Sequence, residues 1–316
     1  MKQLVILSGK GGTGKTSLAA AFAHLAHENP APVKAVLADA DVDAANLGLV
    51  LRLERLETHD FTGGSLAIID PQLCQGCGIC EQVCRFDAVL LPSSNGKGLG
   101  GEVYTIDPIA CEGCAACVYQ CPEEAIRMEP QTAGQWYRSE SRYGPLFHAE
   151  LKPAQENSGK LVTLVKQQAR LAALDGEYPL LIVDGPPGIG CPVISAVSGA
   201  DLALVVTEPT VAGIHDMQRI LKTTAHFRVP TLVCVNKDDI YPEGTRQIEA
   251  FCQKHGLELV GRIPFDEAVT QAMMNGEPVT SYDPESPASR QMVAVWKNVA
   301  TALAVWPIPG KSKEMS

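Results

Sequence analysis

The chain has 316 residues, of which 46% are hydrophobic, and its net charge is −10. This length and composition allow one large or two moderate domains with a substantial core. The acidic balance disfavours nonspecific binding to nucleic acid, and no apolar run is long enough to span a bilayer. Because the N-terminus lacks a signal-peptide pattern, we expect a cytoplasmic protein, in which eleven cysteines indicate metal binding rather than disulfides.

The first motif is a glycine-rich loop between a predicted buried strand, residues 4–7, and a helix that begins near residue 18. Glycines in such a turn let successive backbone N–H groups face an anion, and the helix N-terminus adds its own. The pattern predicts a phosphate-binding loop in which Lys15 reaches the outer phosphates and Thr16 holds magnesium. The predicted loop residues are Gly9, Gly11, Gly12, Thr13, Gly14, Lys15, Thr16 and Ser17.

Lys10, a second lysine near the start of the loop, makes the motif more specific. With it, the loop resembles the deviant phosphate-binding loop of the MinD/Mrp family of ATPases, which includes ParA and the nitrogenase iron protein. The resemblance implies slow ATP hydrolysis with Mg²⁺, in which Lys10 and Lys15 stabilise the developing charge. It also implies a homodimer, or a heterodimer with a paralogous ATPase, in which Lys10 reaches the partner's nucleotide.

Acidic residues follow the second predicted strand, residues 33–39, where they are well placed for metal and water near the phosphates. The alternative is a solvated acidic turn that caps the next helix. The resemblance implies that Asp41 positions or activates the attacking water and that Asp39 lies near Mg²⁺. It places Asn46 in the same switch segment.

From about Phe61 onward the chain contains an internal cysteine repeat. Two runs share the C-x2-C-x2-C-x3-C spacing of bacterial two-cluster ferredoxins, in which the fourth cysteine of each run ligates the other cluster. Zinc held by paired C-x2-C units is the alternative, but it gives no reason for two four-cysteine runs. The spacing predicts one 4Fe–4S cluster on Cys74, Cys77, Cys80 and Cys121 and another on Cys111, Cys114, Cys117 and Cys84.

After the repeat, residues 130–153 show few apolar repeats and are predicted to be a linker that packs through its aromatic side chains. A helix is then predicted to begin near Ser158. Strands alternate with helices from there on, which predicts a doubly wound, mostly parallel α/β sheet that binds its ligands at the strands' carboxyl ends. The predicted strands are 180–184, 202–207, 231–237 and 259–264.

Three further residues lie at or near these strand ends. Asp184 ends a continuous apolar strand, as in a Walker B motif, and is predicted to hold Mg²⁺ together with Thr16 and Asp39. The resemblance places Asn236 and Pro264 at the adenine of the nucleotide.

The roles of the remaining cysteines and of the last helix are the final predictions from the sequence. Cys191 is expected to be a buried structural thiol, with the alternative that, as in the nitrogenase iron protein, it is part of a cluster that bridges two subunits. Cys234 and Cys252 are predicted to be small core residues. The helix at 289–305 is predicted to pack into the core, because Arg290 and Lys297 alone are too few cations for a membrane-surface helix.

As a whole, the sequence resembles a MinD-superfamily ATPase, residues 1–60 and 130–316, with an inserted bacterial-ferredoxin-like α+β domain, residues 61–129. We favour a nucleotide-gated redox switch with a redox or iron–sulfur protein as partner. One alternative is an iron–sulfur carrier or assembly ATPase. Another is a positioning ATPase of the ParA/MinD kind that binds DNA or membrane, which the acidic balance and the last helix disfavour.

Overall fold

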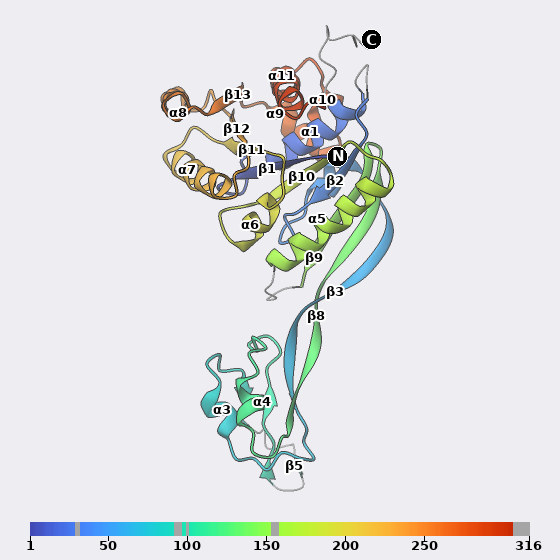
Figure 1. Cartoon of the computed structure of the whole chain (residues 1–316), viewed down its shortest axis with the longest axis vertical. Coiled ribbons are helices and arrows are strands. Elements are labelled where there is room, and N and C mark those ends of the chain that lie inside the picture. Colours follow the sequence, from blue (N-terminus) through green and yellow to red (C-terminus); the bar gives the residue numbers. More distant parts are fainter. Residues whose placement is uncertain (29–31, 92–96, 99–100, 153–157, 306–316) are drawn as a thin grey trace, which may run out of the picture. The chain divides into compact units, whose positions relative to one another are not determined.

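The computed structural model describes residues 1–28, 32–91, 97–98, 101–152 and 158–305. The chain forms two units (Figure 1). We call the first the sheet unit; it consists of Met1–His59, Trp136–Glu150 and Ser158–Ser316. The second, the cysteine unit, consists of Asp60–Gln135 and Leu151–Asn157. The predicted insert, residues 61–129, lies within the first segment of the cysteine unit.

A nine-stranded sheet has the order β13-β12-β11-β1-β10-β2-β9-β8-β3. Its neighbours pair in parallel from β13 through to β9, which confirms the predicted α/β, mostly parallel architecture. The strands are β1 (Lys2–Ser8), β2 (Ala35–Asp39), β3 (Glu54–Ile69), β8 (Ile126–Ser141), β9 (Gly144–Leu151), β10 (Leu180–Pro187), β11 (Leu202–Thr207), β12 (Thr231–Asn236) and β13 (Glu258–Ile263).

Helices cover the sheet between its strands, as the alternating pattern predicts (Figure 1). Residues of α1 and α11 share one buried cluster with Leu4 and Ile6 of β1, while α5 packs against α6 and β2. The helices of the sheet unit are α1 (Lys15–His27), α2 (Leu47–Leu51), α5 (Ser158–Asp175), α6 (Cys191–Val197), α7 (Val211–His226), α8 (Pro242–His255), α9 (Glu267–Met274), α10 (Val279–Tyr282) and α11 (Pro287–Ala302).

The prediction of a linker at residues 130–153 is wrong, because strands β8 and β9 occupy most of it, but its packing through aromatic side chains is confirmed by the buried Tyr137, Tyr143 and Phe147. Alternate residues Tyr137, Ser139 and Ser141 are buried, so the period of a strand is present. Two of these inward positions are serines, which hide the apolar alternation. Both serines are satisfied: the Ser139 hydroxyl bonds His148 Nε2 at 2.9 Å, and the Ser141 hydroxyl donates to the Gly144 carbonyl at 2.7 Å.

In the cysteine unit, the sequence repeat is also a structural repeat. Each cysteine run contains a five-residue helix, α3 (Ile79–Val83) or α4 (Ala116–Gln120). Each helix follows a residue in the left-handed region, Gly78 or Ala115, and leads into the fourth, extended cysteine of its run. Short antiparallel pairs join β4 (Val89–Leu90) to β7 (Thr105–Ile106) and β5 (Lys97–Gly98) to β6 (Gly101–Glu102).

The last helix, α11, packs into the core as predicted. Its inward face includes Met292, Val295 and Trp296, which are at most 1% exposed, and the Trp296 ring lies 5.1 Å from that of Phe22 in α1. Within the described part of the chain, every helix is too short or too polar to cross a membrane.

Replacing Trp296 by Ala should lower the free energy of unfolding by about 3–5 kcal/mol, because it removes a large buried ring and leaves a cavity. Chemical denaturation followed by circular dichroism measures the change. Lys297→Ala, on the exposed side of the same helix, should stay within about 0.5 kcal/mol of the parent. Equal effects of the two variants would contradict the core role of α11.

Candidate functional site

The glycine-rich loop joins β1 to α1 and is held by close contacts at two glycines. Gly14 precedes α1 with φ +91°, and a Cβ added there would meet the Asn236 side chain at 2.3 Å. The Asn236 amide uses this space to donate to the Thr13 carbonyl at 2.9 Å. At Gly9, an added Cβ would lie 2.1 Å from the Cβ of Asp216 in α7. A side chain at either position would therefore displace the loop.

Lys15, at the start of α1, is buried beneath this loop. Its Nζ donates to Ser8 Oγ at 2.7 Å, and Ser8 Oγ in turn donates to the Lys10 carbonyl at the same distance. Burial lowers the pKa of Lys15, and the negative charges of Asp184 and Asp41 oppose this shift. The ammonium group is thus fixed inside the loop, where a phosphate would meet it.

Two buried aspartates lie side by side at the ends of neighbouring strands. Asp39 of β2 is in register with Asp184 of β10, and both are at most 1% exposed. The oxygens of Asp39 accept the backbone N–H groups of Asp41 at 3.1 Å and Leu47 at 3.0 Å. Asp39 therefore orders the segment between β2 and α2, which contains Asp41.

Asp184 differs from Asp39, because neither of its carboxylate oxygens has a hydrogen-bond partner in good geometry. Burial raises the pKa of Asp184 to about 6, although Thr16 and Lys15 act in the opposite direction. Burial also raises the pKa of Asp41, with Lys15 again opposing the shift. An unpartnered buried carboxylate next to a threonine hydroxyl is a donor set that fits Mg²⁺. The structure thus brings Lys15, Thr16, Asp39, Asp41 and Asp184 together.

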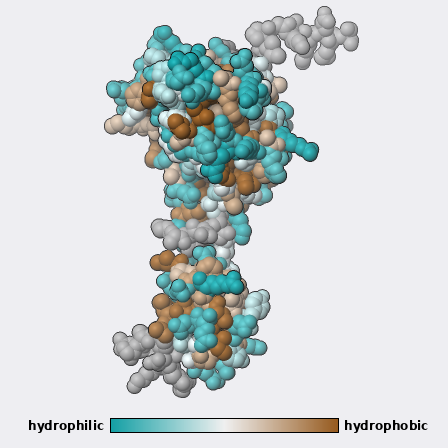
Figure 2. Space-filling model, turned by 90° about the vertical axis from the view of Figure 1, so that its left-hand side faces the viewer, coloured by the Kyte–Doolittle hydropathy of each residue, from teal (hydrophilic) through white to brown (hydrophobic). Residues whose placement is uncertain are grey.

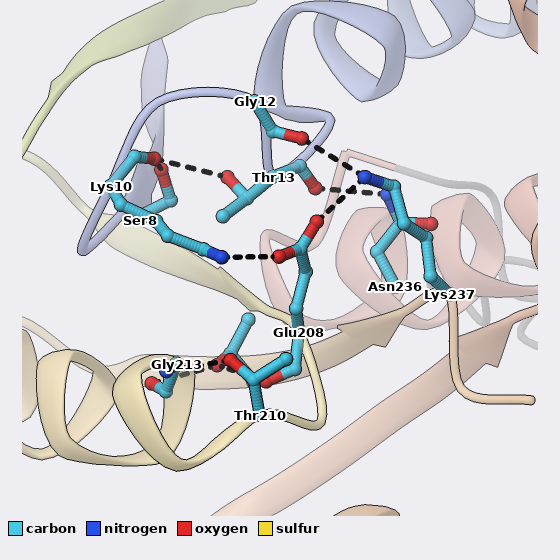
Figure 3. Close-up of polar contacts among 10 residues, drawn as sticks. Ser8, Lys10, Gly12, Thr13, Glu208, Thr210, Gly213, Asn236 and Lys237 are labelled. Atoms are coloured by element: carbon cyan, nitrogen blue, oxygen red, sulfur yellow. Dashed lines mark hydrogen bonds and ion pairs between the residues drawn. The ribbon is translucent and has the colours of Figure 1, made fainter. Parts of the chain in front are cut away.

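Glu208, directly after β11, is a charged residue of this site that the sequence analysis missed. Its two oxygens form ion pairs of 2.6 Å with Lys10 and with Lys237, which also donates to the Gly12 carbonyl at 3.2 Å (Figure 3). Burial alone would raise the pKa of Glu208, but the hydrogen bonds and charges of the two lysines outweigh burial and lower it. One buried carboxylate therefore links both sides of the phosphate-binding loop.

The position of Glu208 was nevertheless visible in the sequence. It follows the predicted strand 202–207, the same kind of place that singled out Asp39 and Asp184. The loop that carries it is held against α7 by two hydrogen bonds. Thr210 Oγ1 accepts the Gly213 N–H at 3.0 Å (Figure 3). Thr207 Oγ1 donates to the Gly213 carbonyl at 3.0 Å.

A cavity of about 160 Å³ adjoins the loop and contains both residues predicted at an adenine. Asn236 and Pro264 lie in its wall with Phe265, and two methionines, Met273 and Met292, add apolar surface. Loop glycines line the same cavity, so it is continuous with the phosphate-binding loop. The full lining is Gly12, Gly14, Ser17, Asn236, Lys237, Pro264, Phe265, Asp266, Val269, Thr270, Met273 and Met292.

Two further cavities lie within the cysteine unit, and four cysteines line each of them. The first contains Cys74, Cys77, Cys80 and Cys121, and the second contains Cys84, Cys111, Cys114 and Cys117. Each of the two predicted ligand sets therefore shares one cavity, including the fourth cysteine that comes from the other run. Among the described residues, no group of three or more His, Cys, Asp or Glu side chains is arranged to hold a single metal ion.

The cysteine sulfurs of these cavities are affected by backbone N–H donors and by burial. The backbone N–H of Ala88 donates to Cys84 Sγ at 3.4 Å, and that of Ala125 donates to Cys121 Sγ at 3.3 Å. Burial raises the pKa of the Cys80 thiol to about 11, so its thiolate needs a nearby positive charge. The repeated N–H···S contact is typical of sulfurs that ligate an iron–sulfur cluster.

The other three cysteines differ in their burial. Cys234 and Cys252 are at most 2% exposed and are core residues, as predicted. Burial raises the pKa of Cys234 to about 12, which makes it an inert thiol. Cys191 is exposed at the first residue of α6, so the prediction of a buried structural thiol is wrong.

Replacing Asp184 by Asn should stabilise the ligand-free protein, and the gain should grow with pH. The folded state keeps the Asp184 proton up to about pH 6, whereas the unfolded chain loses it near pH 4, so stability falls as the pH rises through this window. Removing the carboxylate removes that loss, which is on the order of 2 kcal/mol.

Urea unfolding at pH 4.5 and at pH 8, values chosen to bracket about pH 6, measures the effect. Asp175→Asn, at the exposed end of α5, is the matched control and should show no such pH-dependent gain. A gain for Asp184→Asn that is equal at the two pH values would contradict the buried-charge explanation.

Comparison with known proteins agrees with the geometry of the sheet unit. The family model described as the CobQ/CobB/MinD/ParA nucleotide binding domain matches residues 4–279. An uncharacterized protein of Methanocaldococcus jannaschii is 33% identical over 274 residues, which cover 86% of this chain and 88% of that protein.

Two further relatives are more distant. The septum site-determining protein MinD complexed with Mg-ADP from Pyrococcus horikoshii has a TM-score of 0.58 at 17% identity, over 97% of this chain and 99% of that one. An iron-sulfur cluster carrier protein of Pyrococcus furiosus is 27% identical over 159 residues, which cover 46% of this chain and 53% of that protein. The chain therefore belongs to the CobQ/CobB/MinD/ParA family of nucleotide-binding domains and has a MinD-like fold.

Proposed function

We propose that the chain is a Mg²⁺-dependent ATPase that acts as a dimer and carries two 4Fe–4S clusters, with nucleotide binding controlling their redox behaviour. The nucleotide part is supported by the family, whose MinD and ParA members are in general ATP hydrolases, and by the loop around Lys15. The cluster part rests mainly on one observation, the two cavities that are each lined by four cysteines.

The residues around Lys15 have distinct roles in this proposal. Backbone N–H groups of the loop and the Lys15 ammonium would bind the phosphates, and Asn236 would lie at the base with Pro264. Thr16 and Asp184 would hold Mg²⁺, because Asp184 has two oxygens without partners. Bound Mg²⁺ neutralises phosphate charge during phosphoryl transfer.

Asp39 and Asp41 would act on the same reaction in different ways. The Asp39 oxygens already accept two backbone N–H groups, so Asp39 acts by holding the segment of Asp41 in place. Asp41 would then orient the attacking water.

Lys10 and Glu208 suggest how nucleotide binding is linked to dimerisation. In the single chain, Lys10 is paired with Glu208 rather than extended from the surface. Phosphates bound in the loop would compete with Glu208 for Lys237, and the phosphates of a partner subunit's nucleotide would compete with Glu208 for Lys10, because each lysine is attracted to the larger negative charge. A released Lys10 would be free to reach the nucleotide of a partner subunit.

For the clusters, the eight cysteines supply two complete thiolate sets. A 4Fe–4S cube takes one cysteine at each of four iron corners, so its ligands stand further apart than those of one ion. This spacing accounts for four cysteines around a cavity without a single-ion site. Bound clusters would store and pass single electrons. The N–H groups of Ala88 and Ala125 would tune them by donating to the ligand sulfurs of Cys84 and Cys121.

A continuous stretch of chain connects the two functions. Asp39 holds the backbone N–H of Leu47, the first residue of α2, and β3 begins three residues after α2 ends. β3 then runs from the sheet unit into the cysteine unit. A shift of the Asp39–Leu47 segment would therefore be passed along β3. ATP can drive such a shift only if it binds the two states with different affinities, and the γ-phosphate supplies that difference.

The proposed partner is a redox or iron–sulfur protein that docks on the cysteine unit. Large apolar side chains are exposed there, and Figure 2 shows apolar surface on this unit. Phe86 is 43% exposed and also lines the second cysteine cavity, so this surface adjoins a proposed cluster. The exposed apolar residues of the unit are Leu73, Phe86, Leu90, Leu91, Ile109 and Tyr119.

One alternative function has an observation in its favour. The similarity to an iron-sulfur cluster carrier protein raises the possibility that the clusters are cargo. A carrier needs labile, exposed ligands; Cys77 and Cys114 are exposed, whereas Cys80 is buried. Transfer of iron from the loaded protein to an apo-protein would identify this function, and ATP-dependent binding to DNA or lipid would identify a positioning ATPase.

An anaerobic EPR redox titration of the iron-loaded protein, with and without Mg-ATP, tests the main proposal. We expect about eight iron atoms per chain and a shift in the midpoint potential of at least one cluster when Mg-ATP binds. Lys15→Ala should retain its iron but lose the effect of ATP.

Two cysteine variants control the cluster assignment. Cys77→Ser should lose about half of the iron, whereas Cys252→Ser, a buried cysteine of the sheet unit, should lose none. If both clusters are present but their EPR spectra and midpoint potentials do not change when Mg-ATP is added, the cysteine unit is a docking or sensing module and the gating proposal is wrong.

Replacing Glu208 by Gln should favour the dimer, because it removes the charge that holds Lys10 within its own chain. We expect Mg-ATP-dependent dimerisation at a protein concentration about 3- to 10-fold lower than for the parent, as measured by analytical ultracentrifugation. Glu285→Gln, which weakens the exposed pair with Arg290, is the matched control. Dimerisation of the two variants at the same concentration would rule out a role for Glu208 in retaining Lys10.

A further inference from the structure

A cavity of about 340 Å³ lies in the sheet unit between α5 and α6, away from the phosphate-binding loop. Its most buried lining residue is Gln3, near the amino end of β1, whereas the loop follows the carboxyl end of the same strand. The cavity and the nucleotide site therefore lie at opposite edges of the sheet. Its lining is Gln3, Thr163, Lys166, Gln167, Arg170, Ile194, Ser195, Ser198 and Phe227.

The lining carries two cations and no carboxylate. This is unexpected in a chain with 36 acidic and 26 basic residues. Among the described residues, neither Lys166 nor Arg170 has a carboxylate within ion-pair distance. The exposed Arg170 guanidinium is therefore available to hydrogen-bond a negative ligand, whereas Lys166, whose N–H groups are used within the chain, attracts it by charge alone.

The side chain of Lys166 is held in one position in the wall of the cavity. It is 7% exposed, and its Nζ donates to three backbone carbonyls at the end of α6, those of Ser195 and Ala196 at 2.7 Å and of Ser198 at 2.8 Å. These bonds use all three N–H groups of the ammonium and hold its charge at a constant position. The end of α6 thus fixes a cation beside the cavity.

Gln3 provides a donor that the protein leaves unused. The residue is 3% exposed, and its Nε2 has no hydrogen-bond partner. Its backbone is fixed on both sides by Asp201, whose carboxylate accepts the Gln3 N–H at 2.8 Å and whose N–H donates to the Gln3 carbonyl at 2.9 Å. Buried amide donors are rarely left without an acceptor, so an acceptor supplied by a ligand would satisfy it.

The remaining walls limit the chemistry and the size of the occupant. Ile194 and Phe227 supply apolar surface, while Thr163, Gln167 and the two serines are polar. A volume of about 340 Å³ is at the lower end of the range for small-molecule sites. We propose that this cavity binds a small organic anion, with its acid group between Gln3, Lys166 and Arg170 and its apolar part against Ile194 and Phe227.

Isothermal titration of the full chain with benzoate and with phenyl phosphate tests this proposal, with neutral benzamide as the matched uncharged probe. The protein is first saturated with Mg-ADP, so that the phosphate-binding loop is already occupied. We expect saturable binding of at least one anion, and at least 10-fold weaker binding of benzamide. The stronger of the two anions identifies a carboxylate or a phosphate monoester as the preferred acid.

Two variants locate the binding site. Arg170→Gln removes an exposed cation, and Gln3→Leu removes the unused donor at similar size; each should weaken anion binding by about 10-fold. Arg246→Gln, an exposed arginine of α8 paired with Glu243, is the control and should bind as the parent does. Absence of saturable anion binding, or equal binding by Arg170→Gln and Arg246→Gln, would overturn the proposal.

Discussion

Burial of like charges at the ends of β2 and β10 is the constraint on which the sheet unit's site depends. Parallel pairing places Asp39 and Asp184 in register, and the fold excludes water from both. The buried Lys15 ammonium offsets part of this charge but leaves Asp184 without a hydrogen-bond partner. A site with this imbalance is less stable when empty, so a cation that fills it gains binding energy from relief of the repulsion.

Glu208, on the other side of the loop, differs from Asp184 because it is paired with lysines. There, one carboxylate serves two lysines, and the positive charges are the ones in excess. The ligand-free chain therefore keeps its cations paired and its innermost carboxylate unpaired. The proposed magnesium nucleotide would complement both features at once, because its metal would bind Asp184 and its phosphates would attract the lysines that are now paired with Glu208. The two ion networks explain why nucleotide and dimerisation are expected to be coupled.

The cysteine unit follows a different principle, in which a repeated local conformation does most of the positioning. Each run turns through a left-handed residue, forms one short helix, and ends in an extended cysteine. Those extended ends carry Cys84 and Cys121 across to the cavity of the other run. With the proposed clusters bound, exchange of the fourth cysteine would join the two halves of the repeat into one small unit with little apolar core of its own.

The phosphate-binding loop, the cysteine sets and the parallel sheet were all predictable from the sequence, because each depends on local spacing. A turn such as Gly14 or a C-x2-C-x2-C-x3-C run specifies its backbone within about a dozen residues. Three features were not predictable in this way. They are the pairing of Lys10 and Lys237 with Glu208, the strands β8 and β9, and the cavity lined by Gln3. The inward positions Ser139 and Ser141 of β8 are polar and so give no apolar alternation. Each of the three features depends on residues that are far apart in the chain and meet only when strands and helices pack, and their polar side chains give no hydropathy pattern of their own. Local spacing determined which chemical groups this protein has, and tertiary packing decided which of them are paired and which are left available to a ligand.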